Sequence, residues 1–224
     1  MLGVFVERAM SLKAGSKEVV ETKVEEKVEK EDDGKVSKKD QQRARAFCER
    51  AEKLLKSGKE QEAIKHFVQA LSLDPNHQES LHQLAMLYLS KEMFNPAIEL
   101  FRQLGEMTDD PVHYSHMGFA HFSQNDFEGA RDAYQRAVEL DDSRPQRFVS
   151  LAQVYRALEQ PNHAVMALDK ALAMEPDNRD YLFLMTELKK ETEKKDEAIE
   201  ILKYILELDP ENMEAKILLD DLEA

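Results

Sequence analysis

From about residue 43 onward, apolar residues recur every three or four positions in blocks of about 12–15 residues, with short polar breaks between the blocks. That spacing places the apolar side chains on one face of an α-helix. The breaks are rich in Pro, Gly, Asn and Asp, which end helices or form turns. They fall at Ser57-Gly58, Asp74-Pro75-Asn76, Asp109-Asp110-Pro111, Gln124-Asn125-Asp126, Asp142 to Pro145, Glu159 to Pro161, Glu175-Pro176-Asp177 and Asp209-Pro210-Glu211. The pattern predicts an all-α protein.

Five of the predicted helices repeat at a fixed period. Each begins with an alanine, and successive alanines lie 34, 33, 34 and 34 residues apart. The alanines are Ala63, Ala97, Ala130, Ala164 and Ala198. Four residues after each alanine comes a large side chain: Phe67, Phe101, Tyr134, Leu168 and Leu202. A constant period of this length indicates stacked units, each a pair of helices that buries its apolar face against its neighbours.

The unit resembles the tetratricopeptide repeat, a helix–turn–helix of 34 residues. Its late proline is present as Pro75, Pro176 and Pro210, and the aromatic residue of its first helix as Tyr88 and Tyr155. The repeats are 44–77, 78–110, 111–144, 145–178 and 179–212 within a domain spanning 41–224. The resemblance implies a right-handed superhelical solenoid of helical hairpins.

This chain departs from the family pattern at a few positions. Asp109 and Asp142 stand where two repeats should carry proline, and the second repeat is one residue short. The fifth repeat has Thr186 in place of a small residue and Lys189 in place of the aromatic, so we expect a looser first helix there.

Residues 213–224 resemble the capping helix that ends such arrays. We expect the apolar residues Met213, Ile217, Leu218 and Leu222 to cover the last repeat. The acidic residues Glu214, Asp220, Asp221 and Glu223 then face water. A solenoid needs such a cap because its end otherwise exposes apolar surface.

Residues 1–40 differ in composition from the repeats. They hold nine Lys and Arg against ten Asp and Glu, and a single aromatic residue, Phe5. Such a segment buries too little apolar surface to offset its ordering entropy, so we predict a flexible tether. Leu2–Val6 is apolar and is followed by Arg8, Lys13 and Lys17. It is interpreted either as a frayed tail or as the stub of a membrane anchor whose upstream part lies outside this chain.

Charge and cysteine content narrow the range of partners. The net charge of −14 argues against a nucleic-acid partner and favours a basic or neutral peptide. The single cysteine, Cys48, allows no intramolecular disulfide. We expect a cytoplasmic protein, or one tethered to a membrane through sequence upstream of Met1.

Candidate chemistry is sparse. His113 and His116 lie one helical turn apart and His121 is close in sequence, but no cysteine or carboxylate completes a set of metal ligands. Neither a glycine-rich phosphate loop nor a nucleophile motif is present in the sequence. We therefore predict no metal, no cofactor and no enzymatic activity.

The resemblance to the family implies that the first helices of successive repeats line a concave groove. At its start it places Cys48, Glu52 and Leu55. The candidate partner-binding residues are His82, Met86, Leu89, Ser115, Phe119, Phe122, Val149, Gln153, Arg156, Phe183, Glu187 and Lys190. Met86, Leu89, Phe119 and Phe122 form an apolar trough in this hypothesis, and Arg156, Glu187 and Lys190 supply charge toward the C-terminal end. In the alternative interpretation, some of these residues only pack neighbouring helices together.

One subtype of the family binds the C-terminal carboxylates of chaperones through Lys, Asn and Arg. The corresponding residues here, Cys48, Glu52, Gln83 and His116, do not match it. The sequence thus favours a non-catalytic scaffold or adaptor that binds a protein or peptide with apolar anchors. Two alternatives stay open: a chaperone-like holder of an export or secretion substrate, and a self-assembling oligomer.

Overall fold

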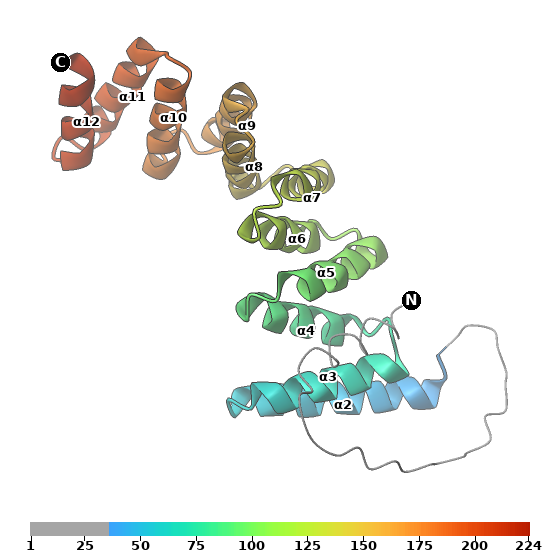
Figure 1. The fold of residues 1–224 in the computed structure, drawn as a ribbon. Coiled ribbons are helices and arrows are strands. Elements are labelled where there is room, and N and C mark those ends of the chain that lie inside the picture. Colours follow the sequence, from blue (N-terminus) through green and yellow to red (C-terminus); the bar gives the residue numbers. More distant parts are fainter. Residues whose placement is uncertain (1–35) are drawn as a thin grey trace, which may run out of the picture. The chain divides into compact units, whose positions relative to one another are not determined.

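The computed structural model describes residues 36–224, and in this part of the chain every regular element is an α-helix (Figure 1). The elements are α2 (Lys38–Lys56), α3 (Glu60–Leu73), α4 (Gln78–Ser90), α5 (Phe94–Thr108), α6 (Pro111–Ser123), α7 (Phe127–Leu140), α8 (Pro145–Ala157), α9 (Pro161–Met174), α10 (Arg179–Glu191), α11 (Lys195–Leu208) and α12 (Met213–Glu223). The prediction of an all-α fold is confirmed for these residues.

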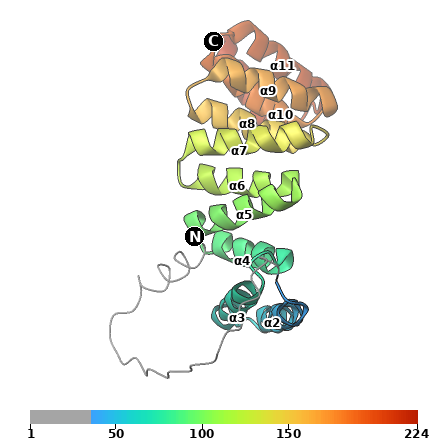
Figure 2. The same cartoon turned by 90° about the vertical axis from the view of Figure 1, so that its right-hand side faces the viewer.

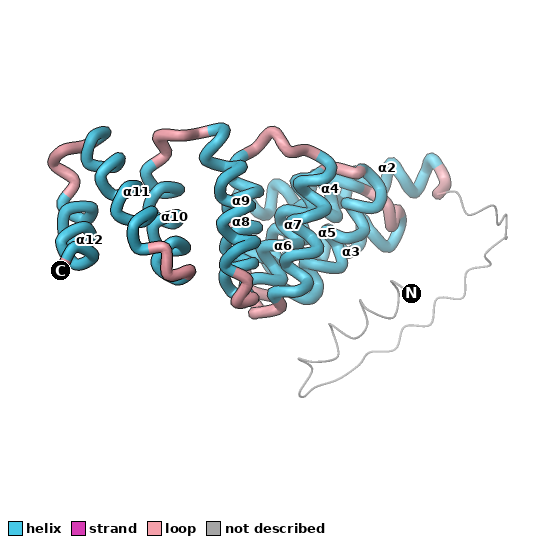
Figure 3. The backbone as a smooth tube through the Cα atoms, turned by 90° about the horizontal axis from the view of Figure 1, so that it is seen from above, coloured by secondary structure: helices cyan, strands magenta, loops and turns pink. Residues whose placement is uncertain are grey.

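The helices stack in the order of the chain. Each packs on the helix before it and the helix after it, from α2 to α12. Figure 2 shows α4 to α8 lying one above another in this order, and Figure 3 shows the connecting loops at the ends of the helices. Because contacts are local, each helical hairpin is stabilised mainly by its neighbours.

The first helix of each later hairpin, and the final helix that caps the array, begin where the sequence period places a new unit. These helices are α4, α6, α8, α10 and α12, which start at Gln78, Pro111, Pro145, Arg179 and Met213. Four of the five have a side chain that caps the free N–H groups of the first turn. The capping residues are His77, Asp110, Asn178 and Asn212. The remaining helix, α8, has no side-chain cap. Proline occupies its first turn, where a backbone N–H would have no hydrogen-bond partner within the helix.

Helix α2 begins earlier than the sequence boundary at residue 40 suggests. Ser37 is its N-cap, and the Ser37 hydroxyl accepts a hydrogen bond from the N–H of Asp40. Residues 38–40 of the predicted tether therefore belong to the first hairpin. The interpretations offered for Leu2–Val6, and for the rest of the tether through residue 35, lie outside the described residues.

The turn inside each hairpin contains one residue in the left-handed backbone region. These residues are Gly58, Glu92, Asn125, Glu159 and Glu193, spaced 34, 33, 34 and 34 residues apart, with φ between 56° and 72°. Only glycine adopts this conformation without strain from a Cβ atom, and asparagine tolerates it better than glutamate. Three of the five turns are therefore built on a residue that the geometry disfavours.

The core consists of small residues where helices cross and large residues beside them. The five periodic alanines are fully buried, as are Phe67, Phe101, Leu168 and Leu202. At one crossing the small residue is Gly118 of α6, where an added Cβ atom would lie 2.8 Å from Cδ2 of Tyr134 on α7. The Tyr134 ring thus occupies the space that a side chain at position 118 would need.

Thr186, the residue that replaces a small one in the fifth repeat, is buried and its hydroxyl donates to the Leu182 carbonyl. Helix α10 is continuous from Arg179 to Glu191. The polar side chain is accommodated inside the helix because its own backbone, one turn earlier, accepts its hydrogen bond.

The capping helix corrects one sequence prediction. Leu222 is buried and Leu218 is half-buried, but Met213 and Ile217 are 64% and 63% exposed. Ala215, Leu218, Leu219 and Leu222 pack into the C-terminal core cluster with residues of α10 and α11. Counted from Ala215, the other packed residues follow at spacings of three, four and seven, so all four lie on one face of α12. Met213 and Ile217 lie on another face.

We expect Glu159→Gly to stabilise the protein by about 0.5–1 kcal/mol, because it removes Cβ strain at a positive φ. Urea unfolding followed by circular dichroism measures the change. The matched control is Glu106→Gly at an exposed position inside α5, which should destabilise by about 1 kcal/mol. Equal destabilisation by both substitutions would contradict the explanation.

Substituting Gly118→Val should destabilise the protein by about 1–3 kcal/mol, because the new side chain overlaps the Tyr134 ring. In a Tyr134→Leu background the same substitution should have a smaller effect, since the flat ring at the crossing is gone. A double-mutant cycle by urea unfolding tests this, and strict additivity of the two changes would exclude a direct clash.

Candidate functional site

An apolar hollow of about 830 Å³ lies between the C-terminal halves of α4 and α6. It is lined by Met86, Leu89, Ser90, Glu92, Phe94, Phe119, Phe122, Ser123 and Asn125. Four of these, Met86, Leu89, Phe119 and Phe122, are the residues that the sequence assigned to an apolar trough. The structure therefore brings these four side chains together around one open space.

The hollow is walled by equivalent residues of two consecutive repeats. Met86 and Phe119 lie 33 residues apart, as do Leu89 and Phe122. The same separation relates Ser90 to Ser123 and Glu92 to Asn125. Sequence reasoning missed the last two pairs and Phe94, although the period that relates the pairs was already visible. It missed them because these residues end the first helices or follow them, and side-chain directions in a turn do not follow helical spacing.

Phe119 is the most open side chain of the apolar lining, with 50% of its surface exposed. Met86, Leu89 and Phe122 are half-buried. The Phe122 ring packs against Phe127 with centroids 5.4 Å apart, and Met86 and Leu89 pack on the N-terminal core cluster. Phe122, Met86 and Leu89 thus also stabilise the fold through their packing. Phe119 lines the hollow, and half of its side chain is exposed.

The candidate residues on α8 and α10 form a separate, charged group. Arg156 of α8 donates to Glu187 at 2.6 Å and to Glu191 at 2.6 Å, both on α10. Sequence reasoning treated Arg156 and Glu187 as independent charges and missed Glu191. The guanidinium is therefore shared by two carboxylates, and the three residues together carry a negative charge. Lys190 is exposed on the same helix.

The other candidate residues have varied surroundings. Val149 and Phe183 are half-buried and pack against core clusters, Gln153 is exposed, and the Ser115 hydroxyl donates to the Pro111 carbonyl. Cys48, placed at the start of the groove, is buried. Burial raises the pKa of its thiol, so at neutral pH this group stays protonated.

Three histidines gather around Phe101. The ring centroid of His82 lies 5.6 Å from that of His113 and 6.3 Å from that of His116. The His116 ring stacks on Phe101 with centroids 5.0 Å apart. Burial lowers the pKa of His113 and of His116. Within residues 36–224 the structure has no group of three or more His, Cys, Asp or Glu placed to hold a metal ion.

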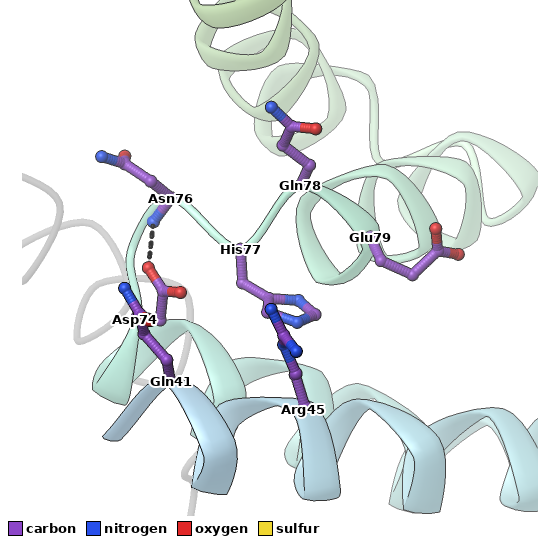
Figure 4. Close-up of a pocket in the computed structure, with 7 residues that line it drawn as sticks. All are labelled: Gln41, Arg45, Asp74, Asn76, His77, Gln78 and Glu79. Carbon is purple, nitrogen blue, oxygen red and sulfur yellow. Dashed lines mark hydrogen bonds between the residues drawn. The ribbon is translucent and has the colours of Figure 1, made fainter. Parts of the chain in front are cut away.

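A smaller hollow of about 320 Å³ lies at the start of the array (Figure 4). Its lining is polar: Gln41, Arg45, Asp74, Asn76, His77, Gln78 and Glu79. His77 caps α4 by accepting from the N–H of Ser80, and Asp74 accepts from the N–H of Asn76, the bond drawn in Figure 4. Both polar groups are thus engaged in ending one helix and starting the next.

Fold and hollow together define a helical-repeat protein with an apolar recess between neighbouring hairpins. Models of the tetratricopeptide repeat match residues 54–117, 114–144 and 146–178. The chain belongs to the tetratricopeptide-repeat family.

A known protein is similar in sequence. The chain is 26% identical over 168 residues to the TPR repeat-containing protein YpiA of Bacillus subtilis (strain 168), covering 75% of this chain and 32% of that protein. It thus spans about a third of the length of this relative.

Solved structures are similar as well. A crystal structure of MamA has a TM-score of 0.69 at 24% identity, covering 74% of this chain and 91% of that one. The structure of YrrB, described as a TPR protein with an unusual peptide-binding site, has a TM-score of 0.67 at 18% identity, covering 81% and 93%. At these identities the likeness shows the fold. In the described part of the chain, none of the helices combines the length and apolar character that a membrane span requires.

The different burial of two phenylalanines predicts different effects on stability. Phe119→Ala should change the free energy of unfolding by about 1 kcal/mol or less, because half of the side chain already faces water. Phe67→Ala, at a fully buried position in α3, should destabilise by about 3–5 kcal/mol. Urea unfolding of both variants tests this; a large loss with Phe119→Ala would make that residue part of the core.

Proposed function

We propose that the protein is a non-catalytic adaptor that binds a peptide segment of a partner protein, with a bulky apolar side chain of the partner seated in the hollow between α4 and α6. The half-exposed Phe119 ring beside Met86, Leu89 and Phe122 is the observation that carries this proposal. An apolar recess rimmed by polar side chains suits an anchoring residue of this kind.

The charge around the hollow favours a basic partner. Residues 78–144, which form the two hairpins that wall it, contain twelve Asp and Glu against five Lys and Arg. Lys91, Arg102, Arg131 and Arg136 are each ion-paired with a carboxylate of this chain. The surplus negative charge raises the local concentration of a cationic segment and speeds its association.

The Arg156–Glu187–Glu191 group extends this preference toward the C-terminal hairpins. Since the guanidinium is already paired with two acids, it offers little attraction to an acidic ligand. We therefore propose a segment that combines an aromatic or long aliphatic anchor with lysine or arginine. The family resemblance and the fold shared with YrrB support peptide binding in general. A cytoplasmic location is part of the proposal and is suited to a chain with one cysteine.

Panning a library of random 12-residue peptides against the full chain tests the proposal. We expect enriched sequences to combine an aromatic, Leu or Met anchor with basic residues. Their affinity should fall about tenfold or more for Phe119→Ser, because the anchor loses its main apolar contact. Isothermal titration calorimetry measures the affinity. The change in affinity between low and moderate salt gives the electrostatic contribution to the binding free energy.

Met166→Ser provides the matched control, since Met166 is 65% exposed on α9, outside the hollow. The Met166→Ser variant should bind the same peptides with the affinity of the unmodified chain. Peptides that bind all three proteins equally well would place the binding site elsewhere on the array.

A further inference from the structure

The three clustered histidines connect the two helices that wall the hollow. His82 belongs to α4 and His113 and His116 to α6, while Phe101 of α5 lies against His82 and His116. The three imidazoles and one phenyl ring thus form a single contact among α4, α5 and α6. Three of the four groups in this contact are imidazoles, the side-chain type whose charge changes in mild acid.

A positive charge in the histidine cluster is energetically unfavourable. His113 is only 9% exposed, and its Nδ1 is buried without a hydrogen-bond partner in the described part of the chain. Burial is the main cause that lowers the pKa of His113 and of His116, and the neighbouring imidazoles lower it further. Protonation therefore requires either water to enter the contact or the helices to separate.

The charged groups around the cluster offer limited compensation. Asp110, the N-cap of α6, is the carboxylate that opposes the downward pKa shifts of His113 and His116. Helix α5 contributes Phe101 to the cluster, and this residue carries no charge. Two charged residues of α5, Glu99 and Arg102, form an ion pair with each other.

The other neighbouring charges are engaged elsewhere. On α7, Arg136 is positioned over the Tyr114 ring and pairs with Asp109. On α4, Glu79 accepts from the Gln83 amide. Asp110 is thus the carboxylate that opposes the pKa shifts of both His113 and His116, while it also caps α6.

The cluster and the hollow share the same two helices, about one turn apart. Met86 follows His82 by four residues on α4, and Phe119 follows His116 by three on α6. Residues at these spacings lie on the same side of a helix. A change in the distance between α4 and α6 at the histidines therefore moves the apolar walls of the hollow with it.

We propose that His82, His113 and His116 form an acid-sensitive contact between the second and third hairpins, which holds the hollow in shape near neutral pH and loosens it in mild acid. The consequence for partner binding rests on the function proposed above. The conformational response itself does not require a ligand.

The direction of the pH effect follows from the lowered pKa values. Below the ordinary histidine value of 6.5, unfolded or opened chains bind protons that the closed contact excludes. The contact is therefore fully stable above about pH 6.5, and its stability is lost as the pH falls through the lower values of the folded protein.

A tryptophan at the hollow tests the proposal without a ligand. The chain contains no tryptophan, so Phe119→Trp in the full chain provides a single reporter. We expect its emission to shift reversibly between about pH 7.5 and pH 5.5, with a midpoint below about 6.5. In the His82→Gln/His116→Gln background the shift should fall to half or less. His66→Gln/His163→Gln, two histidines on α3 and α9, should leave it unchanged.

Two results would overturn the proposal: a constant emission in the parent reporter, or a shift that persists in the His82→Gln/His116→Gln background. If circular dichroism shows that this double variant does not fold, His82→Gln alone takes its place, with the same expectation. NMR titration of the imidazole signals in the unmodified chain gives a further check, and ordinary titration of His113 and His116 near 6.5 contradicts the proposal.

Binding is measured separately, so that failure of the proposed function can be recognised. A peptide selected at about pH 7.5 should bind about fivefold or more weakly at pH 5.5, and this loss should be smaller in the histidine double variant. Lack of any peptide binding at pH 7.5 would refute the proposed function but leave the tryptophan response intact. A reporter shift with unchanged peptide affinity would refute the coupling.

Discussion

The close crossing of the two helices in each hairpin determines the rest of the structure. A fully buried alanine stands at the same place in all five second helices, and Gly118 takes the crossing position of α6 against Tyr134. Because the core is close-packed around these small residues, larger side chains there would push the helices apart, and the helices of a hairpin keep one relative position. The stacking of hairpins then fixes the separation of first helices such as α4 and α6, and with it the width of the hollow.

The hollow is a product of repetition combined with local difference. Equivalent positions of the second and third repeats carry Met86 and Phe119, Leu89 and Phe122, and both turns add polar residues. One repeat later the corresponding positions hold Gln153 and Arg156, and the surface becomes polar and charged. A uniform backbone thus presents an apolar recess at one site and an Arg156–Glu187–Glu191 group at another. Specificity for a partner depends on such differences, since the scaffold itself is shared across the family.

Much of this could be predicted from the sequence because local rules and the repeat period agree. The starts of α4, α6, α8, α10 and α12 coincide with the units read from the period, and the periodic alanines are buried as expected. Met86, Leu89, Phe119 and Phe122 line one hollow. The function of that hollow remains a prediction.

The features that sequence reasoning missed depend on contacts between elements. Helical spacing alone did not tell which face of α12 packs, so Met213 and Ile217 were assigned to the wrong side. The pairing of Arg156 with Glu187 and Glu191 joins residues about one repeat apart. The histidine contact around Phe101 involves three helices. The sequence showed that His113 and His116 are one helical turn apart and that His82 lies one repeat earlier, but not that their rings meet at Phe101.

The most direct test of the central claim is to map where a bound partner touches the array. A photoreactive benzoylphenylalanine in place of Phe119, and separately in place of Met166, reports contact at the hollow and at an exposed site on α9 outside it. With a selected peptide or a captured partner, we expect a covalent adduct from position 119 and none above background from position 166. An adduct formed at position 166 but not at 119 would contradict it and place recognition on another face of the solenoid.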